Sequence, residues 1–137
     1  MATATADDLK RVPLFSDLEG RQLRKLASLC RERTFEPGTS VVREGEMSGV
    51  GFFVVSDGAA TVTVGGEEVL TLGPGDHFGE LALVTEGKRN ATVTANTSLR
   101  CLEIPFWDFR DFAHQNPDVT WKLLQHVVEL YTTTQAS

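Results

Sequence analysis

The sequence lacks several features that would assign it to a particular class of protein. It has two cysteines, Cys30 and Cys101, which are far apart and follow no metal-ligand spacing. No stretch approaches a run of about 18 apolar residues, the length of a membrane-spanning helix. The first residues, MATATADD, lack the basic start and apolar core of an export signal. These absences predict two reduced, buried cysteines in a cytoplasmic protein without membrane insertion.

Positive charge is also scarce. Thirteen Lys and Arg stand against nineteen Asp and Glu, which gives a net charge of -6. The average field of such a chain repels DNA, RNA and anionic lipid, so we expect no nucleic-acid partner. An anionic ligand would have to find a local positive site.

Motifs that would indicate an enzyme are missing as well. The three histidines, His77, His114 and His126, do not form the paired ligands of a metalloenzyme. The sequence has no Gly-x-Ser-x-Gly motif, no catalytic Cys-His spacing and no nucleotide P-loop. We therefore expect a protein that is not an enzyme and that has no catalytic residues, no metal and no cofactor.

The length and patterning of the sequence predict one domain over residues 6–137, after a flexible N-terminus of residues 1–5. Leucines at helical intervals predict helices within 7–31, interrupted at Pro13, and Ser16 with Glu19 fits a capping box. From 33 to 104, short β-branched runs alternate with glycine-containing turns, which is typical of a sandwich, jelly roll or barrel. The predicted strands are 33–36, 40–43, 50–56, 59–64, 67–72, 91–96 and 99–104.

Residues 105–132 predict two C-terminal helices. Asn116, Pro117 and Asp118 match a cap, a first-position proline and a dipole-favourable acid at the start of the second helix. That helix carries two apolar stripes, although packing on one side requires one. The second stripe should meet a ligand, another subunit or a further part of the domain. The first stripe is Val119, Leu123, Val127 and Leu130, and the second is Trp121, Leu124, Val128 and Tyr131. The preceding helix has four aromatic residues that we expect in the core: Phe106, Trp107, Phe109 and Phe112.

The segment FGELALVTEGKRNATV, residues 78–93, carries most of the functional information. It combines an acid, Glu80, a helix start and an arginine, Arg89. The first N–H groups of a helix have no partners within it, and the helix dipole is positive there, so a helix start attracts phosphate. A guanidinium adds a permanent forked charge. The segment therefore predicts an anion site.

In this context the chain resembles the cyclic nucleotide-binding domain family, of the stand-alone bacterial type. The family includes regulatory domains of cyclic-nucleotide-dependent kinases and ion channels, and bacterial transcription factors that sense cyclic AMP. The likeness runs from VPLFSDL through VVREGE and FFVVSDGAATV to LGPGDHFGELAL, and residues 78–93 match the phosphate-binding cassette. The fold implied is α+β and mostly β: a β-roll, or jelly roll, flanked by N-terminal helices, a short cassette helix and two C-terminal helices.

The resemblance also implies roles for individual residues of the cassette. Glu80 matches the acid that accepts a hydrogen bond from the ribose 2′-OH, and Arg89 matches the arginine that pairs with the phosphate. The N–H groups of Leu81 and Ala82 match those that point at the cyclic phosphate. The whole set of implied ligand-binding residues is Phe78, Gly79, Glu80, Leu81, Ala82, Arg89, Asn90 and Ala91.

Base choice rests on fewer positions. Asn90 stands where threonine in guanine-selective members touches phosphate and base, and Leu70 stands where some of those members carry arginine. These departures favour cyclic AMP over cyclic GMP. The resemblance offers Leu70, Trp121, Leu124, Val128 and Tyr131 as candidates for the base pocket and its lid.

The resulting hypothesis is a cytoplasmic sensor, or regulatory domain, for a cyclic mononucleotide. Binding would move the C-terminal helices and alter a surface seen by an unknown protein effector, with a homodimer through the last helix as a further possibility. Two alternatives stay open. One is a ligand-free structural or interaction module with the same fold. The other is a sensor of a different phosphorylated signal, such as a cyclic dinucleotide.

Overall fold

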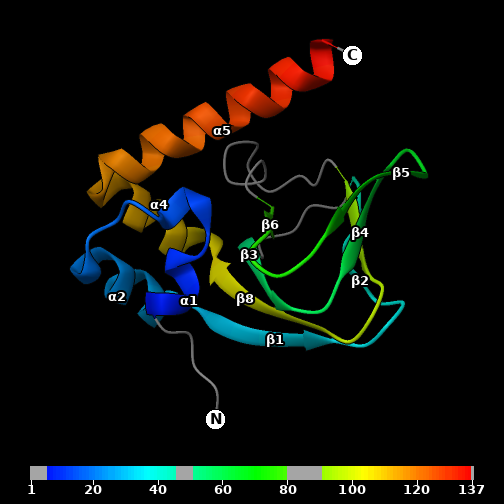
Figure 1. Ribbon diagram of the computed structural model, residues 1–137, viewed down its shortest axis with the longest axis horizontal. Coiled ribbons are helices and arrows are strands. Elements are labelled where there is room, and N and C mark those ends of the chain that lie inside the picture. Colours follow the sequence, from blue (N-terminus) through cyan, green and yellow to red (C-terminus); the bar gives the residue numbers. More distant parts are fainter. Residues whose placement is uncertain (1–5, 46–50, 80–90, 137) are drawn as a thin grey trace.

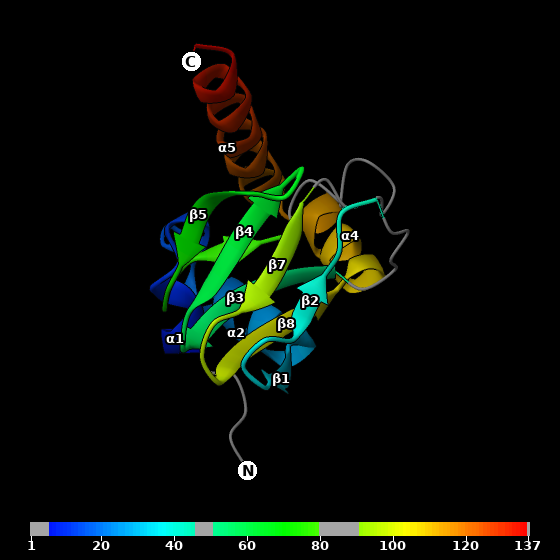
Figure 2. The same cartoon turned by 90° about the vertical axis from the view of Figure 1, so that its right-hand side faces the viewer.

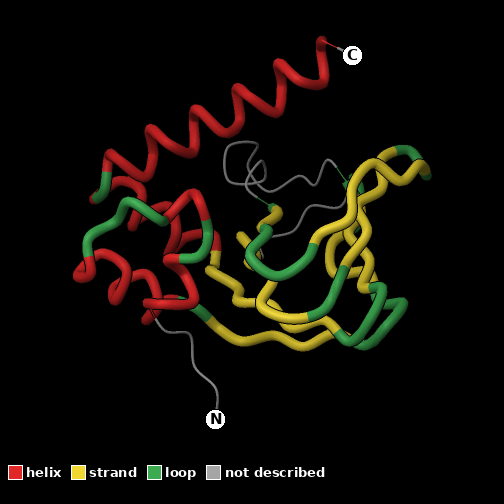
Figure 3. The backbone as a smooth tube through the Cα atoms, viewed as in Figure 1, coloured by secondary structure: helices red, strands yellow, loops and turns green. Residues whose placement is uncertain are grey.

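The computed structural model describes residues 6–45, 51–79 and 91–136, with the backbone alone for Leu14, His126, Val127 and residues 130–136. Apart from the last helix, which extends away from the others, the helices gather at one end of the molecule and the strands at the other (Figure 3). The N-terminus predicted to be flexible and the predicted cassette helix both lie outside the described residues. The helical elements are α1 (Ala6–Lys10), the 3-10 turn η1 (Pro13–Phe15), α2 (Gly20–Leu29), α4 (Phe106–Gln115) and α5 (Pro117–Ala136).

The start of α2 differs from the predicted capping box of Ser16 and Glu19. The Ser16 hydroxyl donates instead to the carbonyl of Pro13 at 2.9 Å, within the 3-10 turn. Glu19 occupies the cap position, and its N–H donates to the Oε1 atom of Gln22 at 2.9 Å. The box therefore forms one turn later than expected, and Ser16 instead closes the 3-10 turn that begins at Pro13.

All seven predicted strands are confirmed, and the structure adds a two-residue strand, β6, that the sequence did not predict. The strands form two antiparallel four-stranded sheets (Figure 2). We call the first, in the order β1-β8-β3-β6, the helix-side sheet, and the second, in the order β2-β7-β4-β5, the outer sheet. The bounds are β1 (Arg31–Phe35), β2 (Ser40–Val42), β3 (Gly51–Asp57), β4 (Ala60–Val64), β5 (Glu67–Leu72), β6 (His77–Phe78), β7 (Thr92–Ala95) and β8 (Leu99–Pro105).

Strand β3 belongs to two hydrophobic cores. Side chains alternate across a strand, so Phe52 and Val54 face the helices while Phe53 and Val55 face the interior of the roll. Strand β8 alternates in the same way. The helix-side core joins this sheet to α1, α2, α4 and α5, and the roll core lies between the two sheets.

Helix α4 packs on the helix-side sheet through its aromatic residues. The ring of Phe109 stacks on that of Phe52, with centroids 5.3 Å apart and planes 9° apart. Phe112 is also buried, but Trp107, expected in the core, is 65% exposed and has Arg110 above its ring. Trp107 lies about 200° around the helix from Phe109, on the side that faces away from the sheet.

Helix α5 begins at Pro117, as predicted, and its C-terminal end projects away from the other helices (Figure 1). Val119 and Leu123 of the first stripe are buried. The Asn116 side chain links two helices: its Oδ1 accepts a hydrogen bond from Gln22 Nε2 at 2.6 Å, and its Nδ2 donates to the Phe112 carbonyl at 2.8 Å. None of the described helices is long and apolar enough to cross a membrane.

Both cysteines are free thiols, as predicted. Cys101 is fully buried in the roll core, whereas Cys30, also expected to be buried, is half-buried at the end of α2. Burial raises the pKa of each thiol from 9.0 to about 12; the nearby Asp8 charge adds to the effect at Cys30, and Arg33 opposes it at Cys101. Both thiols are therefore protonated and unreactive at neutral pH.

Candidate functional site

The predicted anion site is framed by strands from different sheets. Strand β6 enters it from the edge of the helix-side sheet, where Phe78 lies opposite Phe53 of β3. Strand β7 leaves it in the middle of the outer sheet, between β2 and β4. The chain from Gly79 to Ala91 therefore connects the two sheets, and its ends are fixed by the backbone pairing of both.

Phe78 anchors the entry side. Its side chain is buried in the roll core, and its ring stacks on Phe53 with centroids 4.9 Å apart and planes 8° apart. The next residue, Gly79, has a φ of 93°, a conformation that residues with a Cβ rarely adopt. Gly79 thus lets the chain turn out of the strand directly after the buried ring, which explains why a glycine stands at this position.

On the exit side, two hydrogen bonds of Glu44 connect Thr92 and Gly65. The Glu44 N–H donates to the Thr92 hydroxyl at 2.9 Å, and the Glu44 carboxylate accepts from the Gly65 N–H at 2.9 Å. Glu44 thereby joins the ends of β2 and β7 to the turn between β4 and β5. Sequence reasoning missed this role of Glu44, although the VVREGE motif contains it.

Several predicted site residues lie outside the part of the chain that the structure describes. Phe78, Gly79 and Ala91 are described and lie at the two ends of the segment, and Ala91 is half-buried. The anion-binding arrangement itself therefore remains the sequence prediction, set in a described frame. The predicted site residues outside the described part of the chain are Glu80, Leu81, Ala82, Arg89 and Asn90. For Tyr131 the backbone is described but the side chain is not.

The candidates for the base pocket and its lid are exposed apolar residues on two elements. Leu70 of β5 lies opposite Val62, whose side chain packs against the roll core, so both point to the interior side of the outer sheet. The Leu70 side chain is nevertheless 56% exposed. Trp121, Leu124 and Val128 of α5 are each more than half exposed. These four side chains are therefore accessible for contact with a ligand or a partner.

Comparison with known proteins agrees with this frame. The family model of the cyclic nucleotide-binding domain matches residues 32–116. A cAMP-dependent protein kinase regulatory subunit from Yarrowia lipolytica is 48% identical over 94 residues, which cover 67% of this chain and 25% of the relative. The chain thus spans about a quarter of the length of this curated relative.

Solved structures show the same fold. The regulatory domain of Toxoplasma gondii PKA, crystallised with cAMP, aligns with a TM-score of 0.80 and 28% identity, over 90% of this chain and 48% of that one. The N-terminal domain of a transcriptional regulator from Streptomyces coelicolor A3(2) aligns with a TM-score of 0.75 and 29% identity, over 96% of both chains. With the family match and the β-roll, these similarities show that the chain belongs to the cyclic nucleotide-binding domain family.

Proposed function

We propose that this chain is a non-catalytic regulatory domain that binds a cyclic mononucleotide, cyclic AMP in preference to cyclic GMP. The observation that carries the proposal is the cassette sequence FGELALVTEGKRNATV in its structural setting. Its ends belong to β6 and β7, in different sheets. The kinase regulatory subunits among the relatives, one of them crystallised with cAMP, support cyclic AMP.

In this proposal each cassette residue contributes one interaction. The Glu80 carboxylate accepts from the ribose 2′-OH, for which a pure acceptor is suited. Arg89 pairs with the phosphate oxygens, and the N–H groups of Leu81 and Ala82 donate to them. The remaining residues, Phe78, Gly79, Asn90 and Ala91, hold the backbone close to the sugar and phosphate.

The base is proposed to lie against apolar surface. Leu70 offers no charged or forked donor to the oxygen and ring nitrogen of guanine, which favours adenine. Exposed side chains of α5, with Tyr131, are the candidates to cover the base. Burying Leu124 and Val128 against a ligand would remove apolar area from water and so favour a closed arrangement of α5.

Regulation requires that the nucleotide bind one arrangement of the protein better than another. We propose that α4 and α5 are the elements that move, and that their movement alters a surface recognised by a protein effector or by a second copy of the chain. The proposed compartment is the cytoplasm, where cyclic nucleotides act as signals.

Calorimetric titration with cyclic AMP, cyclic GMP and cyclic di-GMP tests the proposal. We expect cyclic AMP to bind most tightly and Arg89→Ala to weaken it at least about tenfold, because the phosphate would lose a charged partner worth about 2 to 5 kcal/mol. Arg21→Ala removes an exposed arginine of α2 and serves as the matched control. Equal titration curves for Arg89→Ala and Arg21→Ala would refute the assignment of Arg89.

The same titrations separate the alternatives. Tightest binding of cyclic di-GMP would indicate a different phosphorylated signal, and binding of none at hundreds of micromolar, roughly the weak end for a ligand site, would favour an interaction module. Movement is tested by backbone NMR shifts across residues 105–131. Shifts unchanged under saturating cyclic AMP would exclude coupling through the C-terminal helices.

A further inference from the structure

Glu44 connects three segments of the outer sheet through its backbone and its side chain. Its N–H donates to the Thr92 hydroxyl at 2.9 Å, and its carboxylate accepts from the Gly65 N–H at 2.9 Å. Thr92 is also paired along the backbone with Thr63 of β4, two residues before Gly65. The end of β2, the start of β7 and the end of β4 therefore form a closed loop of contacts, and Glu44 supplies two of them.

The contact with the turn suits the geometry of a two-residue hairpin. Val64 of β4 pairs with Glu67 of β5, which leaves Gly65 and Gly66 as the loop. Both glycines have positive φ, 61° and 85°, the pattern of a type I′ turn. In such a turn the ladder uses the N–H groups of the two flanking residues, so the Gly65 N–H is left for an acceptor outside the ladder. The Glu44 carboxylate is such an acceptor, and its negative charge strengthens the bond.

The contact with Thr92 lies where the chain leaves the cassette. The described backbone pairing of β2 with β7 ends with Val42 opposite Val93, and the Thr92 hydroxyl extends this junction by one more hydrogen bond. Thr92 directly follows Ala91 and stands three positions after Arg89 in the sequence. A contact that fixes Thr92 therefore fixes the end of the segment from which the proposed phosphate partner comes.

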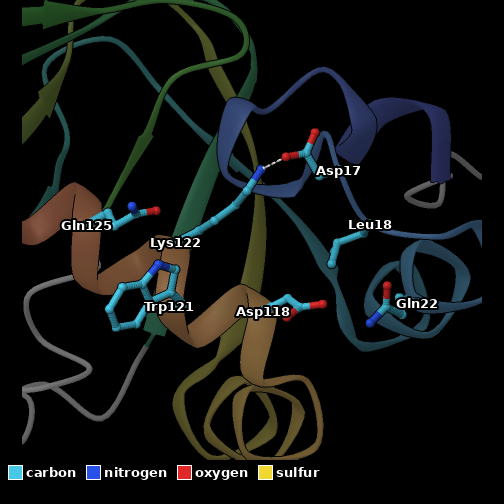
Figure 4. Close-up of a pocket in the computed structure, with 7 residues that line it drawn as sticks. All are labelled: Asp17, Leu18, Gln22, Asp118, Trp121, Lys122 and Gln125. Atoms are coloured by element: carbon cyan, nitrogen blue, oxygen red, sulfur yellow. Dashed lines mark hydrogen bonds and ion pairs between the residues drawn. The ribbon is translucent and has the colours of Figure 1, made fainter.

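Another polar link between segments far apart in sequence lies among the helices, where Asp17 forms an ion pair with Lys122 of α5 (Figure 4). Both residues, with Trp121, line a cleft of about 320 Å³ between the N-terminal helices and the start of α5. Asp17 lies between η1 and α2, so neither segment leads into the cassette. Glu44 differs because one of its two contacts is on the chain directly after the cassette.

We propose that Glu44 is a positioning residue of the nucleotide site, and that through it the turn between β4 and β5 responds to the nucleotide. Glu44 acts through Thr92 rather than by touching the ligand. A change in the position of Thr92 on binding is transmitted to Gly65 by two hydrogen bonds in series. This inference rests on the proposed function, because it concerns the regulation of that same site, and it adds the outer sheet to the elements that respond to the ligand.

Calorimetric titration with cyclic AMP tests the positioning role. Glu44→Ala removes the contact with Gly65 but keeps the backbone N–H that donates to Thr92. It should weaken cyclic AMP about three- to tenfold, the range of a typical hydrogen bond. Glu44→Gln keeps an acceptor oxygen for the Gly65 N–H, so its affinity should stay within about twofold of that of the unaltered chain. Glu68→Ala removes an exposed carboxylate from the same hairpin and is the matched control, with unchanged affinity expected.

A second readout distinguishes positioning from a general loss of stability. In the unaltered chain, saturating cyclic AMP should shift the NMR signal of the Gly65 amide. Glu44→Ala and Thr92→Val break the series of hydrogen bonds at different points, so either change should abolish this response, whereas Glu68→Ala should keep it. A contact that only stabilises the fold would leave the Gly65 signal the same with and without nucleotide.

Three results would overturn the proposal. They are equal affinities of the Glu44→Ala and Glu68→Ala proteins, a Glu44→Gln protein as weak as Glu44→Ala, and a Gly65 amide that does not move when the unaltered chain is saturated with cyclic AMP. Failure of the proposed function gives a different result, because the unaltered chain would then bind no cyclic nucleotide. That result would refute the proposed function and the positioning role together.

Discussion

Two strands of the roll, β3 inside the helix-side sheet and β5 at the edge of the outer sheet, are buried to very different extents. In the helix-side sheet, β3 has five consecutive buried residues, because helices cover one face and the outer sheet covers the other. In the outer sheet, every residue of β5 except Leu72 is exposed. The apolar residues Val64, Val69 and Leu70 are exposed along β4 and β5. The comparison indicates that β3 stabilises the fold through both of its faces, whereas β5 leaves apolar surface available for contact.

The sharpest test of this contrast is a matched pair of truncations. Phe52→Ala should lower the free energy of unfolding by about 3 to 5 kcal/mol, because it opens a cavity under the stacked ring of Phe109. Leu70→Ala should change it by less than about 0.5 kcal/mol, since that side chain is mostly in water already. Urea denaturation followed by circular dichroism measures both changes, and similar losses would remove the distinction between the two strands.

A smaller effect is expected from a polar pair at the edge of the helix-side sheet. Glu103 is 5% exposed, and its carboxylate accepts from Arg33 at 3.1 Å. Arg33→Ala should cost about 1 to 3 kcal/mol, because a buried carboxylate loses its partner. In the outer sheet, Thr61 donates to Asn96 at 2.9 Å in an exposed position. Thr61→Val should cost less than about 0.5 kcal/mol in the same denaturation experiment, and an equal cost would show that burial does not set the difference.

A last predicted effect depends on pH. The pKa of Cys101 is raised by burial from 9.0 to about 12, so the folded chain keeps a proton that the unfolded chain loses. The stability that this proton provides is fully present below pH 9.0, the pKa of the thiol in the unfolded chain. It is lost as the pH rises toward about 12, the pKa in the folded chain.

Between about pH 8 and about pH 10, the unaltered chain should therefore lose about 1 kcal/mol relative to a Cys101→Ala variant. Denaturation curves at both pH values provide the measurement. Comparing the change with pH, rather than absolute stability, removes the cost of truncating the side chain. Parallel changes in both proteins would show that Cys101 does not contribute.

The fold was accessible from the sequence wherever a pattern repeated over several residues. The short β-branched runs and the glycine-containing turns between them located the roll, and the helical spacing located α2 and α5. The two residues of β6 are too few for any period, and their pairing with β3 depends on contacts distant in sequence. Trp107 was assigned to the core because of its residue type, whereas its position on the helix, out of phase with Phe109 and Phe112, determines its exposure.

The candidate site was predictable from the sequence only where its residues belong to one continuous motif. Glu80 and Arg89 were identified from the register of a motif; both lie between β6 and β7, outside the described residues, so their roles stay a prediction. The cleft beside Trp121 could not be predicted, because Asp17 and Lys122 are far apart in sequence and meet only through the packing of α5 on η1. Local patterns cannot reveal such a juxtaposition.

Because β3 is shared by both cores, it determines how the molecule comes apart. Opening the helix-side core would expose Phe52 and Val54 to water, and opening the roll core would expose Phe53 and Val55, so each event removes support from the other face. The helices at one end and the strands at the other should therefore unfold as a single cooperative unit. Amide hydrogens in the centre of β3 should then exchange only through global unfolding, at a rate set by the stability of the whole domain.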